Sequence, residues 1–166
     1  ANDNTAVGKA ALRVNTTGTN NTGIGRKALE ANTTAAQCVA VGNQALEANT
    51  TGNYNVAVGS QALQSNTDGT LNTAVGLQAL EANVSGQKNA AFGTEALQAN
   101  TASNNTAFGR RAGKANTSGT EIVAVGQGAL ESNTTANNNT AIGSNALNLN
   151  VTGADNTAVG QNCLAS

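Results

Sequence analysis

Hydrophobic positions recur along the whole chain at a fixed interval. A motif of the form Ala-Val-Gly returns with its glycine every 17 residues, apart from one interval of 16 between the sixth and seventh copies. Self-similarity at a fixed period is typical of a solenoid, in which each copy packs on the next. The sequence therefore predicts ten copies of one unit, N-T-A-V-G-x-x-A-L-x-x-N-T-T-G-x-x, in a single solenoid over residues 1–166. The ten glycines are Gly8, Gly25, Gly42, Gly59, Gly76, Gly93, Gly109, Gly126, Gly143 and Gly160.

Alternating β-branched and apolar residues precede each of these glycines. The residue directly before the glycine is Val, Ile or Phe in every copy, and the residue two earlier is Thr, Val or Ala. Period-2 spacing of such residues is typical of a short strand. We therefore predict an all-β fold, a parallel β-solenoid or β-roll of ten coils of about 17 residues. Coils stacked at about 4.8 Å give a rod on the order of 43 Å long.

The residue between these two positions is never larger than Ala. It is Ala in nine copies and Gly in the second. A strand face open to water accepts larger polar side chains in some copies, so this restriction indicates a close neighbour. We predict that another copy of the chain packs against this face, as a homotrimer or in an end-to-end fibre. The face is formed by Ala6, Ala40, Ala57, Ala74 and their equivalents.

A second fixed element, Ala-Leu, follows each glycine. Its Leu is replaced in the seventh copy by Gly113, and the same copy carries Phe108 where most have Val or Ile. A small-for-large change matched by a large-for-small change predicts that the two positions meet in the core. The residues around Ala-Leu are good helix formers, so this segment is either one helical turn or a second short strand.

An asparagine follows the Ala-Leu element in nine copies. Asn tolerates the left-handed backbone region and binds turn backbone through its side chain. Stacking brings equivalent residues above one another, so the sequence predicts an asparagine ladder. Its members are Asn15, Asn32, Asn49, Asn66, Asn83, Asn100, Asn116, Asn133 and Asn150.

The composition offers little chemistry. Ala, Asn, Thr and Gly supply 32, 27, 22 and 19 of the 166 residues, and there is no His. The residues therefore predict no catalytic, cofactor-binding or metal-binding site, and no enzyme. No run of about 18 apolar residues is present, so we expect no membrane insertion. A net charge of -1 gives no electrostatic basis for binding nucleic acid.

The charged residues and cysteines predict no site either. Glu30 and Glu47 take equivalent places in adjacent coils, which brings like charges near each other at little cost on an exposed face. Cys38 and Cys163 belong to the third and tenth coils, about 34 Å apart, which excludes an intrachain disulfide. We interpret both as inert small side chains. The basic residues, interpreted as a solvated face, gather at Lys9, Arg13, Arg26, Lys27, Arg110, Arg111 and Lys114.

The strand motif resembles that of a known family. Asn4-Thr5-Ala6-Val7-Gly8 and Asn72-Thr73-Ala74-Val75-Gly76 are similar to the S-V-A-I-G motif in the heads of trimeric autotransporter adhesins. The longer unit also resembles repeats of phage tail fibres and similar surface fibres. The resemblance implies a left-handed parallel β-roll in which three chains pack side by side. The A-L-x-x-N segment makes the coil longer here than in the adhesin heads.

These patterns favour a structural role. We expect a non-catalytic structural or adhesive rod, a segment of a longer extracellular or virion fibre that presents a binding tip to a cell-surface or host receptor. The alternative is an ice-binding solenoid that uses Thr and Asn ladders. Its Thr ranks break at Asp68, Val84, Ala102 and Val151 and include Thr16/Thr17, Thr33/Thr34, Thr50/Thr51 and Thr134/Thr135.

Overall fold

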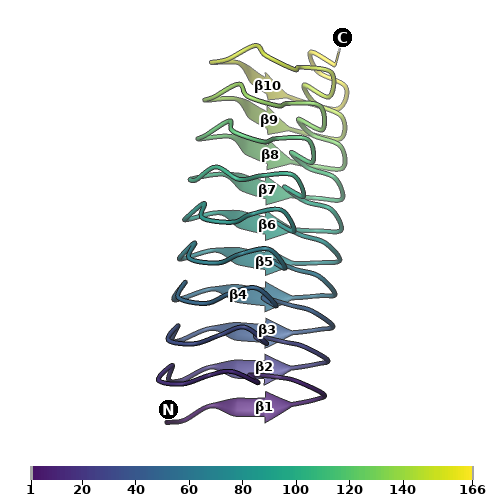
Figure 1. The fold of residues 1–166 in the computed structure, drawn as a ribbon. Helices are drawn as coiled ribbons and strands as arrows, with labels where there is room; N and C mark the ends of the chain where they lie inside the picture. Colours follow the sequence, from purple (N-terminus) through teal and green to yellow (C-terminus); the bar gives the residue numbers. More distant parts are fainter. Residues whose placement is uncertain (1, 166) are drawn as a thin grey trace.

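The computed structural model describes residues 2–165 and confirms the parallel β-solenoid. Ten three-residue strands, one in each coil, form a single parallel sheet in sequence order, and the two termini lie at opposite ends of the stack (Figure 1). Adjacent strands pair in register, so equivalent positions of the repeat lie above one another. The strands are β1 (Thr5–Val7), β2 (Thr22–Ile24), β3 (Val39–Val41), β4 (Val56–Val58), β5 (Thr73–Val75), β6 (Ala90–Phe92), β7 (Thr106–Phe108), β8 (Val123–Val125), β9 (Thr140–Ile142) and β10 (Thr157–Val159).

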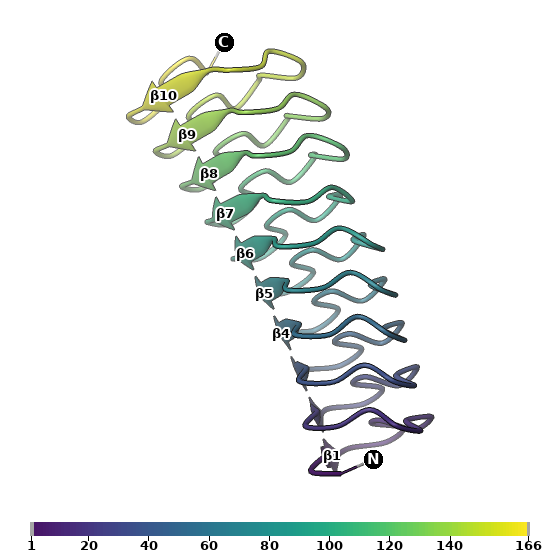
Figure 2. The same ribbon diagram turned by 90° about the vertical axis from the view of Figure 1, so that its left-hand side faces the viewer.

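Hydrogen bonds between coils continue beyond the strands. The N–H of Leu46 donates to the carbonyl of Ala62 at 3.0 Å, and the N–H of Thr50 donates to the carbonyl of Thr67 at 2.9 Å. Every coil therefore needs its backbone donors, which agrees with the absence of Pro from the chain. The column of strands slants across the rod because each coil is slightly displaced relative to the last (Figure 2).

The small residue of each strand points into its own coil. The partner interface predicted from the sequence consists of Ala6, Ala40, Ala57 and Ala74. The last three are fully buried within the chain itself, and Ala6 holds the same position in the exposed first coil. A Cβ added at Gly23 would lie 3.4 Å from Cγ of Leu12, so this position faces the Leu of the preceding coil. The prediction of a partner on the Ala face was wrong, because the close neighbour is the chain's own core.

The Ala-Leu segment consists of sharp turns. In the third coil Gln44 and Leu46 have φ angles of 61° and 50°, both in the left-handed region. A helix needs successive right-handed residues, so neither a helical turn nor a second strand forms here. A left-handed Leu costs about 1 to 2 kcal/mol. The Leu46 side chain is fully buried, and burial of that size offsets the cost.

Ile122 fills the space left by the missing Leu of the seventh coil. A Cβ on Gly113 would lie 2.9 Å from Cδ2 of Leu97 and 3.4 Å from Cδ1 of Ile122, which is fully buried. Phe108 points outward and is 45% exposed. The prediction that Phe108 meets Gly113 was therefore wrong. The side-chain volume lost at Gly113 is instead supplied by Ile122, at a position where eight other copies carry the smaller Asn.

We predict that Gly113→Leu alone destabilises the fold by about 1 to 3 kcal/mol through overpacking. The double variant Gly113→Leu/Ile122→Asn restores the repeat sequence at both positions and should recover most of that loss. Urea denaturation of the parent, the two single variants and the double variant checks this. If the double variant were no more stable than Gly113→Leu, the side chains at positions 113 and 122 would not compete for the same space in the core.

Candidate interaction surface

The predicted asparagine ladder is present and buried. The side-chain Nδ2 of Asn66 donates to Oδ1 of Asn49 at 2.8 Å and to the carbonyl of Gly69 at 3.0 Å. The ladder is broken once, at the 16-residue coil. There Nδ2 of Asn100 keeps the bond to the turn carbonyl, here that of Ala102, but does not reach Oδ1 of Asn83, which has no partner among the described residues. These amides hold the axial register of the coils.

A second ladder, which was not predicted from the sequence, lies directly before the strands. Oδ1 of Asn55 accepts the backbone N–H of Asn72 at 3.0 Å, and its Nδ2 donates to the carbonyl of Gly69 at 2.7 Å. Eight copies carry Asn here, while Cys38 and Ile122 occupy the other two. That recurrence next to a buried strand was the signal that could have revealed it. Both ladders use interior polar groups for structure.

The cysteines take part in this interior. Both thiols are free, as predicted, with Cys38 buried in the second ladder and Cys163 partly buried in the last coil. Burial raises the pKa of the Cys38 thiol, and bonds from the backbone of Asn55 and Tyr54 only partly oppose this. The thiol of Cys38 also lies 3.2 Å from the carbonyl of Gly52.

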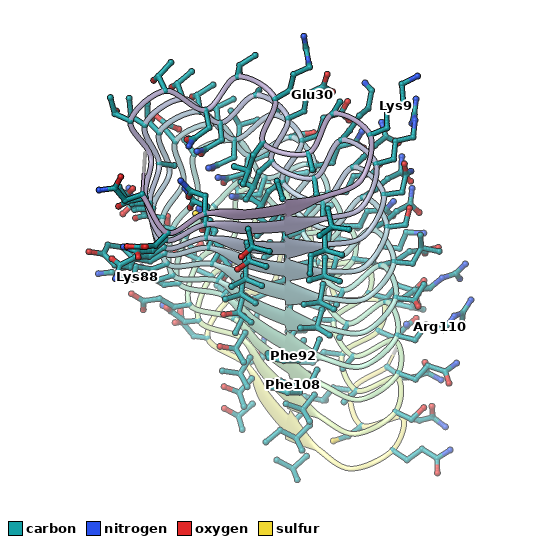
Figure 3. All side chains as sticks on the ribbon, turned by 90° about the horizontal axis from the view of Figure 1, so that it is seen from below. Lys9, Glu30, Lys88, Phe92, Phe108 and Arg110 are labelled. Atoms are coloured by element: carbon teal, nitrogen blue, oxygen red, sulfur yellow. The ribbon has the colours of Figure 1, made fainter. Side chains whose placement is uncertain are left out.

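The exposed side of the sheet is an apolar strip that runs the length of the rod. We call it the outer face: the outward-pointing first and third residues of β1 to β10. Val7, Phe108 and Val159 on it are 57%, 45% and 65% exposed. Phe92 and Phe108 stack on each other near the middle, with ring centroids 4.4 Å apart and planes at 10° (Figure 3). The large residues of the strand motif thus face outward.

The two corners that border the outer face differ in charge, and their charged side chains are exposed. Figure 3 shows Lys88 at the corner before the strands, and Lys9 and Arg110 at the corner after them. We define the corner after the strands as the residue that directly follows the motif glycine of each coil. Its charged residues are all positive: Lys9, Arg26 and Arg110. The corner before the strands is the position two residues ahead of each strand. Its charged residues are mainly acidic: Asp3, Glu121 and Asp155, with Lys88 as the exception.

Much of the remaining charge is paired between coils. Lys27 lies between the two carboxylates predicted to oppose each other, with Nζ 2.6 Å from Oε1 of Glu47 and 3.2 Å from Oε2 of Glu30. Oε2 of Glu95 forms ion pairs with Nζ of Lys114 at 2.6 Å and with Nε of Arg111 at 3.1 Å. These cations therefore link neighbouring coils in addition to being solvated.

The bridge at Glu47 makes stability depend on pH. Burial raises the pKa of Glu47, but bonds from Lys27, Gln64 and Gln44 outweigh it and hold the pKa below its usual value. Stability from this group is therefore present above the usual Glu pKa and lost as pH falls through the lowered pKa. We predict that Glu47→Gln flattens the acid limb of the stability profile in urea denaturation. Parallel profiles for the parent and Glu47→Gln would contradict the prediction.

The predicted Thr ranks lie on turns. The hydroxyl of Thr33 donates to the carbonyl of Thr50 at 3.1 Å, and that of Thr50 to the carbonyl of Thr67 at 3.0 Å. Val84 and Val151 interrupt this rank. Its hydroxyl protons are thus committed to the neighbouring coil.

An open trough of about 650 Å³ lies away from the outer face. Its lining includes the small residues Ala82, Ala99 and Ala115, beside Glu81 and Gln98. Nε2 of Gln98 donates to Oε2 of Glu81 at 2.7 Å, so this wall also links adjacent coils.

The fold and repeat define a parallel β-solenoid repeat protein. Within residues 2–165, no group of three or more His, Cys, Asp or Glu is arranged to hold a metal ion, and no helix is long and apolar enough to cross a membrane. Comparisons with protein-family models, curated proteins and solved structures find no match. The resemblance to adhesin heads and tail fibres thus rests on the repeat motif itself.

Proposed function

We propose that the chain is a non-catalytic rod, a structural or adhesive segment of an extracellular or virion fibre. The observation that supports this best is the continuity of the ladders between coils. Backbone bonds connect every coil to the next, and two ranks of buried Asn amides add side-chain bonds at nearly every step. Interior polar groups that bond chiefly to the next coil set one axial spacing along the rod.

Such a rod suits a spacer that holds a binding part away from a surface. Each coil contacts mainly its neighbours, so the length grows with the number of repeats while the cross-section stays the same. In the proposed fibre, the part that meets a cell-surface or host receptor is carried by the rod.

Immuno-electron microscopy tests the proposal. Antibodies raised against the purified rod should label filaments on the outside of the cells or particles that produce it. A rod-deleted strain provides the control for specificity. Labelling confined to the cell interior would contradict the fibre assignment.

Ice binding is the second candidate, favoured by the even spacing of the Thr rank along the rod. The committed hydroxyls of Thr33 and Thr50 and the interruptions at Val84 and Val151 argue against it. We expect no thermal hysteresis from the purified protein. A freezing gap with shaped ice crystals would instead favour the ice-binding function.

A further inference from the structure

We propose that the outer face is the contact between copies of this chain, which lie side by side, parallel and in register. The proposal deepens the proposed function by naming the partner of the rod, a second copy of the same chain. The sequence predicted a contact between copies on the Ala face, whereas the proposed contact uses the opposite face of the sheet. The strand residues that point outward form the contact, and the Ala face belongs to the core.

The size and composition of the outer face fit a stable interface. The strip is about 43 Å long, and with its two bordering corners about 20 Å wide, which presents on the order of 800 Å² per copy. Specific interfaces bury about this area on each partner. The strands themselves are about 10 Å wide and supply roughly half of this area, and Val7, Ile142 and Val159 are among their exposed apolar residues.

The stacked phenylalanines supply a centre for the contact. Phe92 and Phe108 belong to the sixth and seventh of ten coils and project from the outer face. Because their planes lie nearly parallel at 4.4 Å, the pair forms one rigid apolar projection. Large aromatic side chains near the middle of an interface carry much of the binding free energy.

Charge decides the relative direction of the copies. When copies are related by rotation about an axis parallel to the rod, the corner after the strands meets the next copy's corner before the strands. Arg110 follows β7 and Glu121 precedes β8, so they lie within one coil spacing, about 5 Å, along the axis. Lys9 follows β1 and Asp3 precedes it. Parallel, in-register packing thus brings Lys9 opposite Asp3 and Arg110 near Glu121. Lys88 then has the neutral Thr94 opposite it in its own coil, with Arg110 one coil further along.

Antiparallel packing lacks this match. A rotation that reverses the rod while bringing the outer faces together places equivalent corners opposite each other, with the first coil against the last. Asp3 of one copy then lies opposite Asp155 of the other, and no opposite-charge pair forms. Like charges juxtaposed across an interface disfavour that partner arrangement.

Sedimentation equilibrium of the purified chain tests the contact. We expect a mass above that of one chain at micromolar concentration. Phe108→Asp should raise the dissociation constant at least about 100-fold. The matched control is Val84→Asp, because Val84 is 44% exposed but lies on a turn away from the strands. A single-chain mass for the parent, or equal effects of the two variants, would overturn the proposal.

A charge exchange tests the direction. Arg110→Glu and Glu121→Arg should each weaken association about tenfold, because each places like charges together. The double variant should restore the parent constant, since the pair re-forms between copies with reversed sign. No restoration would overturn the parallel register.

Circular dichroism and small-angle scattering of each variant show whether the rod remains folded. The substituted side chains are exposed, so we expect every variant to keep the fold. A chain that proves to be an elongated monomer would remove this inference and leave the proposed fibre role intact. Immunolabelling inside the cell would remove the fibre role without affecting the contact between copies.

Discussion

Gly59→Ala is expected to destabilise the rod by more than about 4 kcal/mol, the largest effect of any single substitution considered for this chain. Gly59 has a φ of 139°, which side chains rarely adopt, and an added Cβ would lie 2.4 Å from the carbonyl oxygen of Gly76. That neighbour is backbone of the next coil and cannot rotate away. The substitution must therefore separate two coils in the middle of the stack. Urea denaturation followed by circular dichroism measures the loss.

Gly128→Ala is the matched control. Gly128 has a φ of 65°, and equivalent positions in other coils carry Gln44 and Gln61 at φ angles of 61° and 60°. A Cβ at Gly128 would approach Oδ1 of Asn145, a side-chain atom that can move. We expect a loss below about 1 kcal/mol. Similar losses for the two glycine variants would contradict the argument from backbone contact.

Asn66→Ala is expected to cost about 2 to 4 kcal/mol. The substitution removes the Nδ2 bonds to Oδ1 of Asn49 and to the carbonyl of Gly69, and it removes the acceptor for Nδ2 of Asn83 at 2.9 Å. Oδ1 of Asn49 is left buried without a donor, which costs more than the lost bond itself. Urea denaturation gives the free energy of unfolding.

Asn43→Ala provides the comparison, because Asn43 is exposed and its bonds lie on the surface. We expect a change within about 0.5 kcal/mol. Hydrogen exchange adds a test of locality. Amides near Asn66 should lose protection in Asn66→Ala while those of the tenth coil keep theirs, because coils contact mainly their neighbours. Uniform loss of protection would contradict a ladder that acts step by step.

The strands and the asparagine ladder could be predicted because they depend on local pattern and on repetition. Thr, Val and Ile at alternate positions favour extended backbone, and a constant period places equivalent residues above one another. The turns around Leu46 could not be predicted in this way. Its neighbours have helical propensity, and only the fit of the Leu side chain into the closed coil favours the left-handed backbone.

The neighbour of the Ala face could not be identified from the sequence. Restriction to Ala at positions such as Ala57 shows that something lies close, and a sequence cannot distinguish a partner chain from the opposite wall of the same coil. The outward position of Phe108 and the alignment of Arg110 with Glu121 depend on how the coil closes. No single repeat contains that information.

By itself, the sequence determined the period, the strands, their parallel order and the ladder of Asn15 to Asn150, because a constant repeat leaves one way to stack identical units. The tertiary structure decided which strand face is inside. Alternation only assigns residues to two opposite faces, and the identity of the inner one depends on where the chain returns after its corners. Those corners require left-handed Leu, which propensity disfavours and only burial in the closed coil stabilises.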